Sequence, residues 1–358
     1  MEVTTRCNLV CTFCSHSSLE KDQKGNMDLD VYRSVIAEGE RYGTPATNLN
    51  GLGEPMLVRQ LPEMLAYAKE RGFVDVMFHT NGTIMTEGHA RALIESNLDK
   101  IIFSVDSPDK ATYEQMRIRG KYDRVLSHVR LFAAMREAMG RSTPLIRTTM
   151  VVTDKTVHQV PDFVKLWKPL ADQITLQDLT WRSKALDTGE WSNSEQSAVP
   201  ADMDEIRQKS IEHKVSFVCP YLYQSSYTFW NADVIPCSNP NARTHMVMGQ
   251  IGPRTMHQVW HGKTYRDIRG LHASGKWYEH PVCRDCEVPL IELYKALDKR
   301  GVTFESARPD PESAAPRVAE ELTPQDDTAT DLVTQYKRQL VWPENVAKPV
   351  DAVAPRSA

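Results

Sequence analysis

The placement of the cysteines constrains this chain more than any other feature. Seven cysteines form two groups, one near the N-terminus and one more than two hundred residues later: Cys7, Cys11 and Cys14, then Cys219, Cys237, Cys283 and Cys286. An odd number of cysteines, without a signal-peptide pattern before them, argues against a disulfide framework. Clustered thiols in a reducing compartment are usually metal ligands. The sequence therefore predicts two metal-binding regions in a cytoplasmic protein.

Composition excludes several classes of partner. Of the 358 residues, 41% are hydrophobic and 25% are charged, which are ordinary values for a globular protein. The net charge of −4 leaves no excess of basic residues for a nucleic acid or an anionic membrane surface. No apolar run approaches the ~20 residues that a membrane span needs. We expect neither a nucleic acid nor a membrane as partner.

Short β-branched runs alternate with amphipathic stretches up to about residue 180. The predicted strands are Val3–Thr5, Thr47–Leu49, Val74–Phe78, Lys100–Val105, Leu145–Val152 and Gln173–Leu176. The predicted helices between them are Leu29–Arg41, Leu61–Arg71, Glu87–Ser96, Val125–Ala138 and Val157–Trp167. Successive βαβ units form a parallel sheet, and six of them favour an open (β/α)6 partial barrel. The fold class is thus α/β, with functional groups at the carboxyl ends of the strands.

Changes in composition suggest four segments. Residues 1–182 form the α/β core, and residues 183–214 form a polar, turn-rich linker followed by a helix near Met203–His213. Residues 215–300 hold the last four cysteines and a hairpin that turns at residues 231–233. Residues 301–358 are rich in proline and mixed charge, which predicts a mostly disordered tail with a short helix at 331–340.

The first cysteine group has the spacing C-x3-C-x2-C. One loop therefore supplies three soft ligands, which suit a [4Fe–4S] cluster in which one iron has no protein ligand. A structural zinc site would need a fourth ligand, and His16 is the nearby candidate. Met1 lies only six residues before Cys7, so the first strand is short or the natural chain begins upstream.

The string from Cys7 to Cys14, with Phe13 before the third cysteine, resembles the signature of radical S-adenosylmethionine (SAM) enzymes. In that family the three cysteines bind a [4Fe–4S] cluster, and its open iron binds the amino and carboxylate groups of SAM. Reduction cleaves SAM to a 5′-deoxyadenosyl radical, which abstracts a hydrogen atom from the substrate. The resemblance implies Cys7, Cys11 and Cys14 as cluster ligands and Phe13 as an aromatic near the adenine.

Further motifs follow the predicted strands in the order that this resemblance implies. Gly53, Glu54 and Pro55 are similar to the family's GGEP element, whose backbone and acid receive the SAM amino group. Thr80 and Asn81 are similar to the TNG segment beside the SAM ribose. Each string taken alone is typical of an ordinary turn. Their order after a matching cysteine triplet makes them specific.

The fourth predicted strand ends in a segment similar to the family's S-[LIV]-D element. The resemblance implies that Ser104 contacts the SAM carboxylate. The following Arg117-Ile118-Arg119-Gly120 resembles a segment that often supplies an arginine to the same carboxylate. We prefer Arg119 over Arg117 for this role. The sequence identifies no catalytic acid or base.

The second cysteine group contains a complete ligand set. Cys219 and Cys237 enclose 17 residues around the predicted hairpin, and Cys283 and Cys286 form a C-x2-C turn. Four thiolates suit either a structural zinc ion or a [4Fe–4S] cluster. After a radical SAM core, this layout resembles the SPASM/twitch class of extensions. Full SPASM domains carry seven cysteines and two auxiliary clusters. Because this chain has four cysteines in the second group, the resemblance implies one auxiliary [4Fe–4S] cluster here.

The resemblance implies a radical SAM oxidoreductase whose cofactors are SAM and two [4Fe–4S] clusters. The auxiliary spacing is similar to that of an aminocyclitol dehydrogenase in this class, which favours two-electron oxidation of a sugar, an aminocyclitol or another natural product. The expected partners are a small-molecule or peptide substrate and a reductase such as flavodoxin or ferredoxin. One alternative is epimerisation or another modification of a ribosomal peptide. Another is a non-catalytic zinc or iron–sulfur scaffold.

Overall fold

A five-stranded parallel sheet forms the centre of the N-terminal half. The structure, a computed structural model, describes residues 1–153, 155–178, 202–239, 241–284 and 286–305. The sheet order is β2-β3-β4-β6-β7, which confirms the α/β class. Its strands are β2 (Ala46–Asn48), β3 (Asp75–Thr80), β4 (Lys100–Ser104), β6 (Leu145–Val152) and β7 (Gln173–Asp178). All five correspond to predicted strands.

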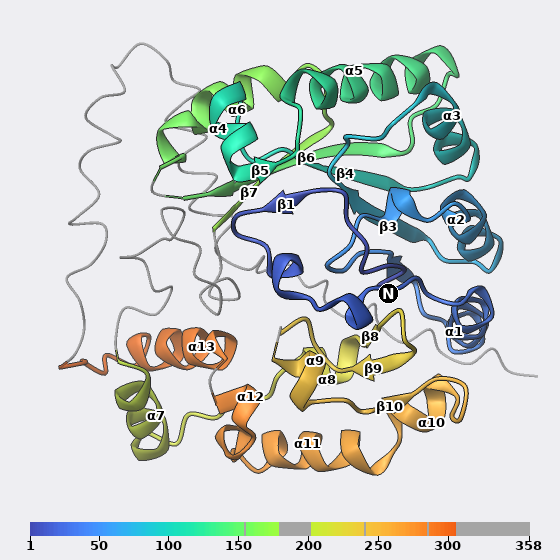
Figure 1. Ribbon diagram of the computed structural model, residues 1–358. Helices are drawn as coiled ribbons and strands as arrows, with labels where there is room; N and C mark the ends of the chain where they lie inside the picture. Colours follow the sequence, from blue (N-terminus) through green and yellow to red (C-terminus); the bar gives the residue numbers. More distant parts are fainter. Residues whose placement is uncertain (154, 179–201, 240, 285, 306–358) are drawn as a thin grey trace, which may run out of the picture. The chain divides into compact units, whose positions relative to one another are not determined.

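Helices cover one side of this sheet (Figure 1). They are α1 (Leu29–Arg41), α2 (Leu61–Glu70), α3 (Glu87–Glu95), α4 (Lys110–Met116), α5 (Tyr122–Ala138) and α6 (Val160–Trp167). The side chain of Asp28 caps α1 by accepting from the amides of Asp30 and Val31. The sequence pattern missed α4, which has only seven residues and begins where Asp109 accepts from the amide of Thr112.

The first predicted strand, Val3–Thr5, does not join the sheet. In Val3–Thr5, Thr4 forms only an isolated bridge with Asn26, and the Thr5 amide donates to the carbonyl of Gly25. The segment pairs with a loop that precedes α1, so its hydrogen-bonding groups are satisfied away from β2. A separate two-stranded antiparallel ladder joins β1 (Val10–Cys11) to β5 (Arg117–Ile118). The described barrel therefore has five parallel strands instead of six.

The C-terminal half is a small unit of short elements. A three-stranded antiparallel sheet contains β8 (Tyr227–Thr228), β9 (Asp233–Ile235) and β10 (Gly249–Gln250), and β8 and β9 form the predicted hairpin. The helices are α7 (Met203–Glu212), α8 (Tyr221–Gln224), α9 (Ala242–His245), α10 (Met256–Trp260), α11 (Lys263–Ala273), α12 (Pro281–Arg284) and α13 (Glu287–Asp298). The predicted linker at 183–200, nearly all of the predicted tail, and its helix at 331–340 lie outside the described residues.

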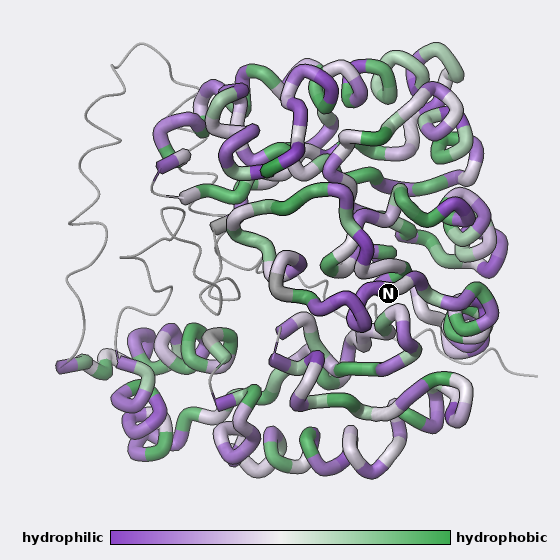
Figure 2. Tube along the Cα trace, in the orientation of Figure 1, coloured by the Kyte–Doolittle hydropathy of each residue, from purple (hydrophilic) through white to green (hydrophobic). Residues whose placement is uncertain are grey.

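Three hydrophobic clusters stabilise these parts. The largest lies between the parallel sheet and its helices and includes Phe78, Phe103 and Trp167. A second fills the C-terminal unit around Val234 and Val259, and a third joins α7 to α13. Figure 2 shows hydrophobic and hydrophilic residues alternating along the outer helices, as expected for amphipathic helices over a core. None of the described helices has the length and hydrophobicity that a bilayer crossing requires.

Candidate functional site

The three N-terminal thiols lie on one loop around β1. Cys7, Cys11 and Cys14 are each partly exposed and free of disulfide bonds. Burial raises the pKa of Cys11 to about 12, and the other two thiols are close enough to act on it electrostatically. Among the described residues, no three potential ligands converge tightly enough to hold a single metal ion. Ligands of a cubane cluster bind separate irons, so this spacing is compatible with a cluster.

Donor groups surround these sulfur atoms. The amide of Leu9 donates to Cys7 Sγ at 3.5 Å, and Asn81 Nδ2 lies 4.0 Å from the same sulfur. Arg117 Nη1 lies 3.9 Å from Cys11 Sγ. Hydrogen bonds to the sulfur atoms favour thiolates bound to iron. The residues present therefore fit an iron–sulfur cluster.

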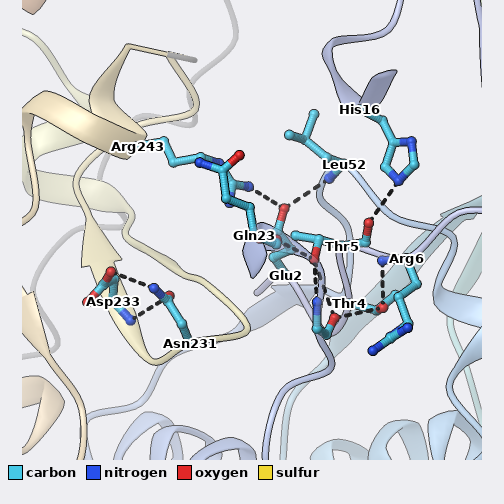
Figure 3. Close-up of polar contacts among 11 residues, drawn as sticks. Glu2, Thr4, Thr5, Arg6, His16, Gln23, Leu52, Asn231, Asp233 and Arg243 are labelled. Carbon is cyan, nitrogen blue, oxygen red and sulfur yellow. Dashed lines mark hydrogen bonds and ion pairs between the residues drawn. The ribbon is translucent and has the colours of Figure 1, made fainter. Parts of the chain in front are cut away.

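His16, the alternative fourth zinc ligand, has another contact. Its ring is buried, and Nε2 donates to the carbonyl of Thr5 at 2.9 Å (Figure 3). Burial lowers the pKa of His16. The hydrogen bond ties the end of the cysteine loop to the N-terminal segment, which is a structural role.

Arg117 and Arg119 occupy different surroundings. Arg117 is buried because β5 pairs it with Cys11, and its Nε donates to Asp106 Oδ2 at 2.6 Å. Its guanidinium lies 5.9 Å from the ring centre of Phe13. Arg119 is exposed and has a positive φ of 73°. Arg117 thus lies against a sulfur atom of the cysteine loop, whereas Arg119 lines a cavity beside Cys7, and the role of Arg119 stays a prediction.

Asp106 explains why Arg117 is fixed. This carboxylate is fully buried, and Oδ1 accepts from the amide of Val151 at 2.9 Å while Oδ2 accepts from Arg117. The residue has a positive φ of 63°, a conformation that aspartate tolerates better than most residues. A buried carboxylate needs such a partner, because an unpaired charge in the interior is costly.

Glu54 is a buried carboxylate at the carboxyl end of β2. It is 3% exposed and accepts from Thr80 Oγ1 at 2.9 Å and from the amide of Asn81 at 2.7 Å. Burial raises its pKa, and these hydrogen bonds oppose the rise. Pro55 follows as the first residue of a 3-10 helix that Glu54 caps. Three of the predicted SAM-site residues, Glu54, Thr80 and Asn81, therefore form one hydrogen-bonded group.

Close packing against the backbone of the N-terminal segment requires a glycine at position 53. A Cβ atom at this position would lie 2.3 Å from the carbonyl oxygen of Thr4 and 2.8 Å from that of Arg6. The loop approaches the N-terminal segment so closely that only glycine fits. This packing also brings the amide of Glu54 to the carbonyl of Arg6, at 2.8 Å.

The sheet face away from the helices is polar. Side chains alternate along each strand, so the register places Ser104 beside Thr149, and His79 and Arg147 on either side of Ile102. The Thr149 hydroxyl is buried and has no partner among the described residues. An unpartnered buried hydroxyl next to Ser104 is suited to a polar ligand. Sequence reasoning named Ser104 and missed Thr149, because a threonine within a strand carries no signal of its own.

A cavity of about 380 Å³ adjoins the cysteine loop, with Cys7, His16 and Val10 among its lining residues. Three cations also line it, Arg6, Lys24 and Arg119. None of these three forms a salt bridge with another residue in the described ranges. The cavity is therefore basic and is suited to negatively charged groups.

The four C-terminal thiols come together from three separate segments. Cys219 precedes α8, Cys237 follows β9, and Cys283 and Cys286 lie on α12 and at the N-cap of α13. All four are partly exposed, and none of them forms a disulfide bond. Burial raises the pKa of Cys283, and the other three thiols act on it in the same direction. The predicted ligand set is thus assembled in one place, although two of its members are 67 residues apart (Cys219 and Cys286).

Glu2 links the two halves (Figure 3). It is 1% exposed, and its Oε1 accepts from the amide of Leu52 at 3.0 Å and from the guanidinium of Arg243. Arg243 follows Cys237 in the C-terminal unit, and its guanidinium lies 3.9 Å from the ring centre of Phe229. Leu52 belongs to the same loop as Glu54. The contact therefore joins the loop after β2 to the unit that carries the second thiol group.

Comparison with known families agrees with this geometry. Residues 1–166 match the radical SAM superfamily, and residues 219–287 match the iron–sulfur cluster-binding domain called SPASM. Residues 1–166 therefore form a radical SAM domain, and residues 219–287 form a SPASM domain. The cofactors are therefore a [4Fe–4S] cluster and SAM in the first domain and additional iron–sulfur cluster binding in the second. Both parts of the predicted family assignment are confirmed.

Curated relatives have different activities. A tungsten-containing aldehyde ferredoxin oxidoreductase cofactor-modifying protein of Pyrococcus furiosus is 22% identical, over 80% of this chain and 86% of the relative. An AdoMet-dependent heme synthase of Nitratidesulfovibrio vulgaris is 28% identical, over 62% of this chain and 59% of the relative. A probable GTP 3′,8-cyclase of Methanococcus maripaludis is 27% identical over 45% of this chain and 52% of the relative. The match thus spans about half of the cyclase.

Two solved structures with TM-scores above 0.5 share the fold. The enzyme anSMEcpe with bound AdoMet has a TM-score of 0.56 at 17% identity, covering 83% of this chain and 96% of that chain. Streptococcus suis SuiB bound to S-adenosylmethionine has a TM-score of 0.58 at 14% identity, covering 75% and 67%. BtrN in complex with AdoMet and 2-DOIA has a TM-score of 0.47 at 18% identity, covering 80% and 90%.

Proposed function

We propose that this radical SAM enzyme is an oxidoreductase that removes two hydrogen atoms from a polar substrate. The preferred substrate class is a sugar, an aminocyclitol or a similar natural product. The observation that carries the proposal is the complete set of four thiols in the C-terminal unit. Four protein ligands occupy every iron of a [4Fe–4S] cluster, so the substrate has no iron to bind and the cluster is suited to electron transfer.

When bound, SAM and the core cluster would supply one-electron cleavage of SAM and removal of a hydrogen atom from the substrate, and the auxiliary cluster, held by Cys219, Cys237, Cys283 and Cys286, would supply an acceptor for the second electron. The chain's own residues position these groups. Cys7, Cys11 and Cys14 would hold the core cluster. Glu54 offers a fixed carboxylate for an ammonium group, because Thr80 and Asn81 hold its two oxygens.

The polar sheet face supports the substrate class. Ser104 and Thr149 lie side by side in register, with the Thr149 hydroxyl unpartnered and buried. Hydroxyl groups can donate and accept, which suits SAM polar groups and a polyhydroxylated substrate. Phe13 and Arg117, next to the cysteine loop, complete the proposed SAM surroundings.

The basic cavity supports an acidic electron donor. Arg6, Lys24 and Arg119 line the same cavity as Cys7 and form no salt bridge with a carboxylate among the described side chains. An acidic flavodoxin or ferredoxin would be attracted to this charge, and the attraction would weaken as salt is added. Such a donor and seven reduced thiols suit a cytoplasmic location.

The alternative of peptide epimerisation or modification rests on the same radical step. SuiB bound to its precursor peptide SuiA shares the fold at a TM-score of 0.57. That likeness, at 14% identity, concerns the fold alone. A peptide reaction would leave the auxiliary cluster as an electron source or relay. The scaffold alternative would leave SAM intact.

A product assay separates these outcomes. The anaerobically reconstituted full chain would be incubated with SAM, dithionite and a panel of amino sugars, aminocyclitols and short peptides in deuterated water. The proposal predicts 5′-deoxyadenosine together with a product lacking two hydrogens. A peptide of unchanged composition that gains solvent deuterium would favour epimerisation. Absence of 5′-deoxyadenosine with zinc in the protein would favour the scaffold.

A thiol variant tests the electron-relay role. Cys283→Ala/Cys286→Ala should retain some SAM cleavage, while loss of two hydrogens from the substrate stops. A folded metal site can contribute on the order of 10 kcal/mol to local folding. The circular dichroism spectrum and solubility must therefore match those of the wild type. Normal product formation by the folded variant would contradict the relay.

A further inference from the structure

His272 is a buried histidine beside the second thiol group. It lies near the end of α11, on the face that also buries Tyr265 and Ile268, and it is 1% exposed. The ring of Phe217 contacts it edge-on, with ring centres 6.3 Å apart. Nothing in the sequence pattern distinguishes this residue from an ordinary core histidine.

Both ring nitrogens of His272 contact predicted cluster ligands. The backbone amide of Cys219 donates to Nδ1 at 3.3 Å, and Nε2 lies 3.5 Å from Cys283 Sγ. A backbone N–H can only donate, so Nδ1 is the acceptor. Because an accepting nitrogen carries no proton, the ring proton resides on Nε2. The tautomer is thus set, and Nε2 donates to the sulfur of Cys283.

We propose that His272 raises the reduction potential of the auxiliary cluster through this N–H···S hydrogen bond. Reduction adds negative charge to the cluster and its thiolates, and a donor at a sulfur atom stabilises the more negative state. A higher potential makes the cluster a better electron acceptor. His272 is therefore a positioning and tuning residue, and this inference rests on the auxiliary cluster of the proposed function.

At the first thiol group the 3.5 Å donor to a sulfur atom is a backbone amide, that of Leu9. The described side-chain donors there, Arg117 and Asn81, lie farther away, at 3.9 and 4.0 Å from their sulfur atoms. His272 is closer to its sulfur and also holds the backbone of a second ligand. It therefore connects two ligands that are 64 residues apart, Cys219 and Cys283.

Two substitutions separate hydrogen bonding from packing. His272→Phe keeps an aromatic ring against Phe217 and removes the donor. His272→Gln can place an amide N–H near the position of Nε2. His261→Phe is the control, because His261 is exposed and its ring contacts His257. The full-chain protein would be reconstituted anaerobically and titrated electrochemically without substrate, with both clusters followed by electron paramagnetic resonance.

His272→Phe should lower the auxiliary potential enough to shift the one-electron reduction equilibrium about tenfold, which corresponds to about 59 mV. His272→Gln should restore most of the potential, and His261→Phe should leave it unchanged. The core cluster should keep its potential in all variants. An unchanged auxiliary potential in His272→Phe would overturn the proposal. Loss of the auxiliary cluster in both His272 variants would also overturn it, because the role would then be structural.

The titration is independent of the proposed reaction. If the wild-type protein holds two clusters and the potential shifts as expected, the tuning role stands whatever the substrate assay gives. Zinc in place of iron at the second thiol group would overturn both proposals. Two clusters with an unshifted potential would overturn only the role of His272.

Discussion

The two thiol groups are assembled in opposite ways. Cys7, Cys11 and Cys14 come from one loop of eight residues, next to a basic cavity of about 380 Å³. The second group gathers four thiols from three segments, and three of these thiols contact the hydrophobic cluster of the C-terminal unit. All seven thiols are partly exposed, but one site has three ligands beside a cavity, and the other has four ligands, three of which pack against hydrophobic side chains. Ligand number and the neighbouring cavity suit SAM binding at the first group, and the complete ligand set suits electron transfer at the second.

The polar groups around the sulfur atoms differ as well. At the first group a buried ion pair, Arg117 with Asp106, brings a charged donor toward Cys11. At the second group a neutral ring, His272, donates to Cys283. A fixed positive charge favours a negatively charged ligand such as a carboxylate, whereas a neutral donor adjusts the sulfur without attracting an anion. The comparison teaches that similar ligands serve different tasks according to their surroundings.

The sharpest way to break this comparison is to remove each thiol group separately. Cys7→Ala/Cys11→Ala/Cys14→Ala should abolish 5′-deoxyadenosine formation under dithionite, because no other described site leaves an iron open for SAM. The matched variant Cys283→Ala/Cys286→Ala should retain part of this 5′-deoxyadenosine formation. Chromatography of the nucleoside products, with iron counted in each protein, measures the effect. Full cleavage by the triple variant would reverse the two assignments.

A second test compares the two arginines near the first group. Arg117→Ala should lower the free energy of unfolding by about 3 kcal/mol, because the buried Asp106 loses its partner. Arg119→Ala should change it by less than about 0.5 kcal/mol, since the side chain is exposed. Urea unfolding of the reconstituted proteins gives both values, and equal stability of the variants would show that the ion pair is unimportant. SAM affinity of Arg119→Ala tests the original prediction for that residue.

A third test concerns the carboxylate and hydroxyl proposed for SAM. Glu54→Ala should weaken SAM binding about 10- to 100-fold, because hydrogen bonds to a charged group contribute about 1.5–3 kcal/mol. Glu54→Gln is the control that keeps the shape and removes the charge. Ser104→Ala should weaken SAM binding about fivefold, because one neutral hydrogen bond is lost. Anaerobic calorimetry measures the affinities; wild-type binding by both alanine variants, with normal iron content, would show that the motifs were assigned to the wrong residues.

The smallest effect is expected from shortening the chain. A protein ending at Glu305 retains the ring contact of Phe304 with Tyr294 and the hydrogen bond from the Glu305 amide to Glu205. The proline content and mixed charge of the removed segment predict little burial of apolar area. Iron content and the rate of SAM cleavage should therefore match the full chain. Loss of either cluster would show that the segment contributes to one of the two sites.

Much of the fold could be predicted because its signals are local. The five sheet strands and helices such as Leu29–Arg41 follow from hydrophobic periodicity, and the structure places them within a few residues. The segment Val3–Thr5 was misassigned because its β-branched residues indicate an extended backbone without specifying a partner. Its partners are the residues before α1. Helix α4 was missed because seven residues give too little periodicity.

The sequence by itself determined the thiol counts, the order of the motifs and the family, since each depends on residue types at short spacings. Only the tertiary structure decided which arginine lies against the sulfur of Cys11 and what holds Glu54. Arg117 is 106 residues from Cys11, and the antiparallel pairing of β1 with β5 brings them together. Likewise, His272 is 53 residues from the Cys219 amide that sets its tautomer. Such contacts depend on how distant elements pack, and a local pattern carries no record of that packing.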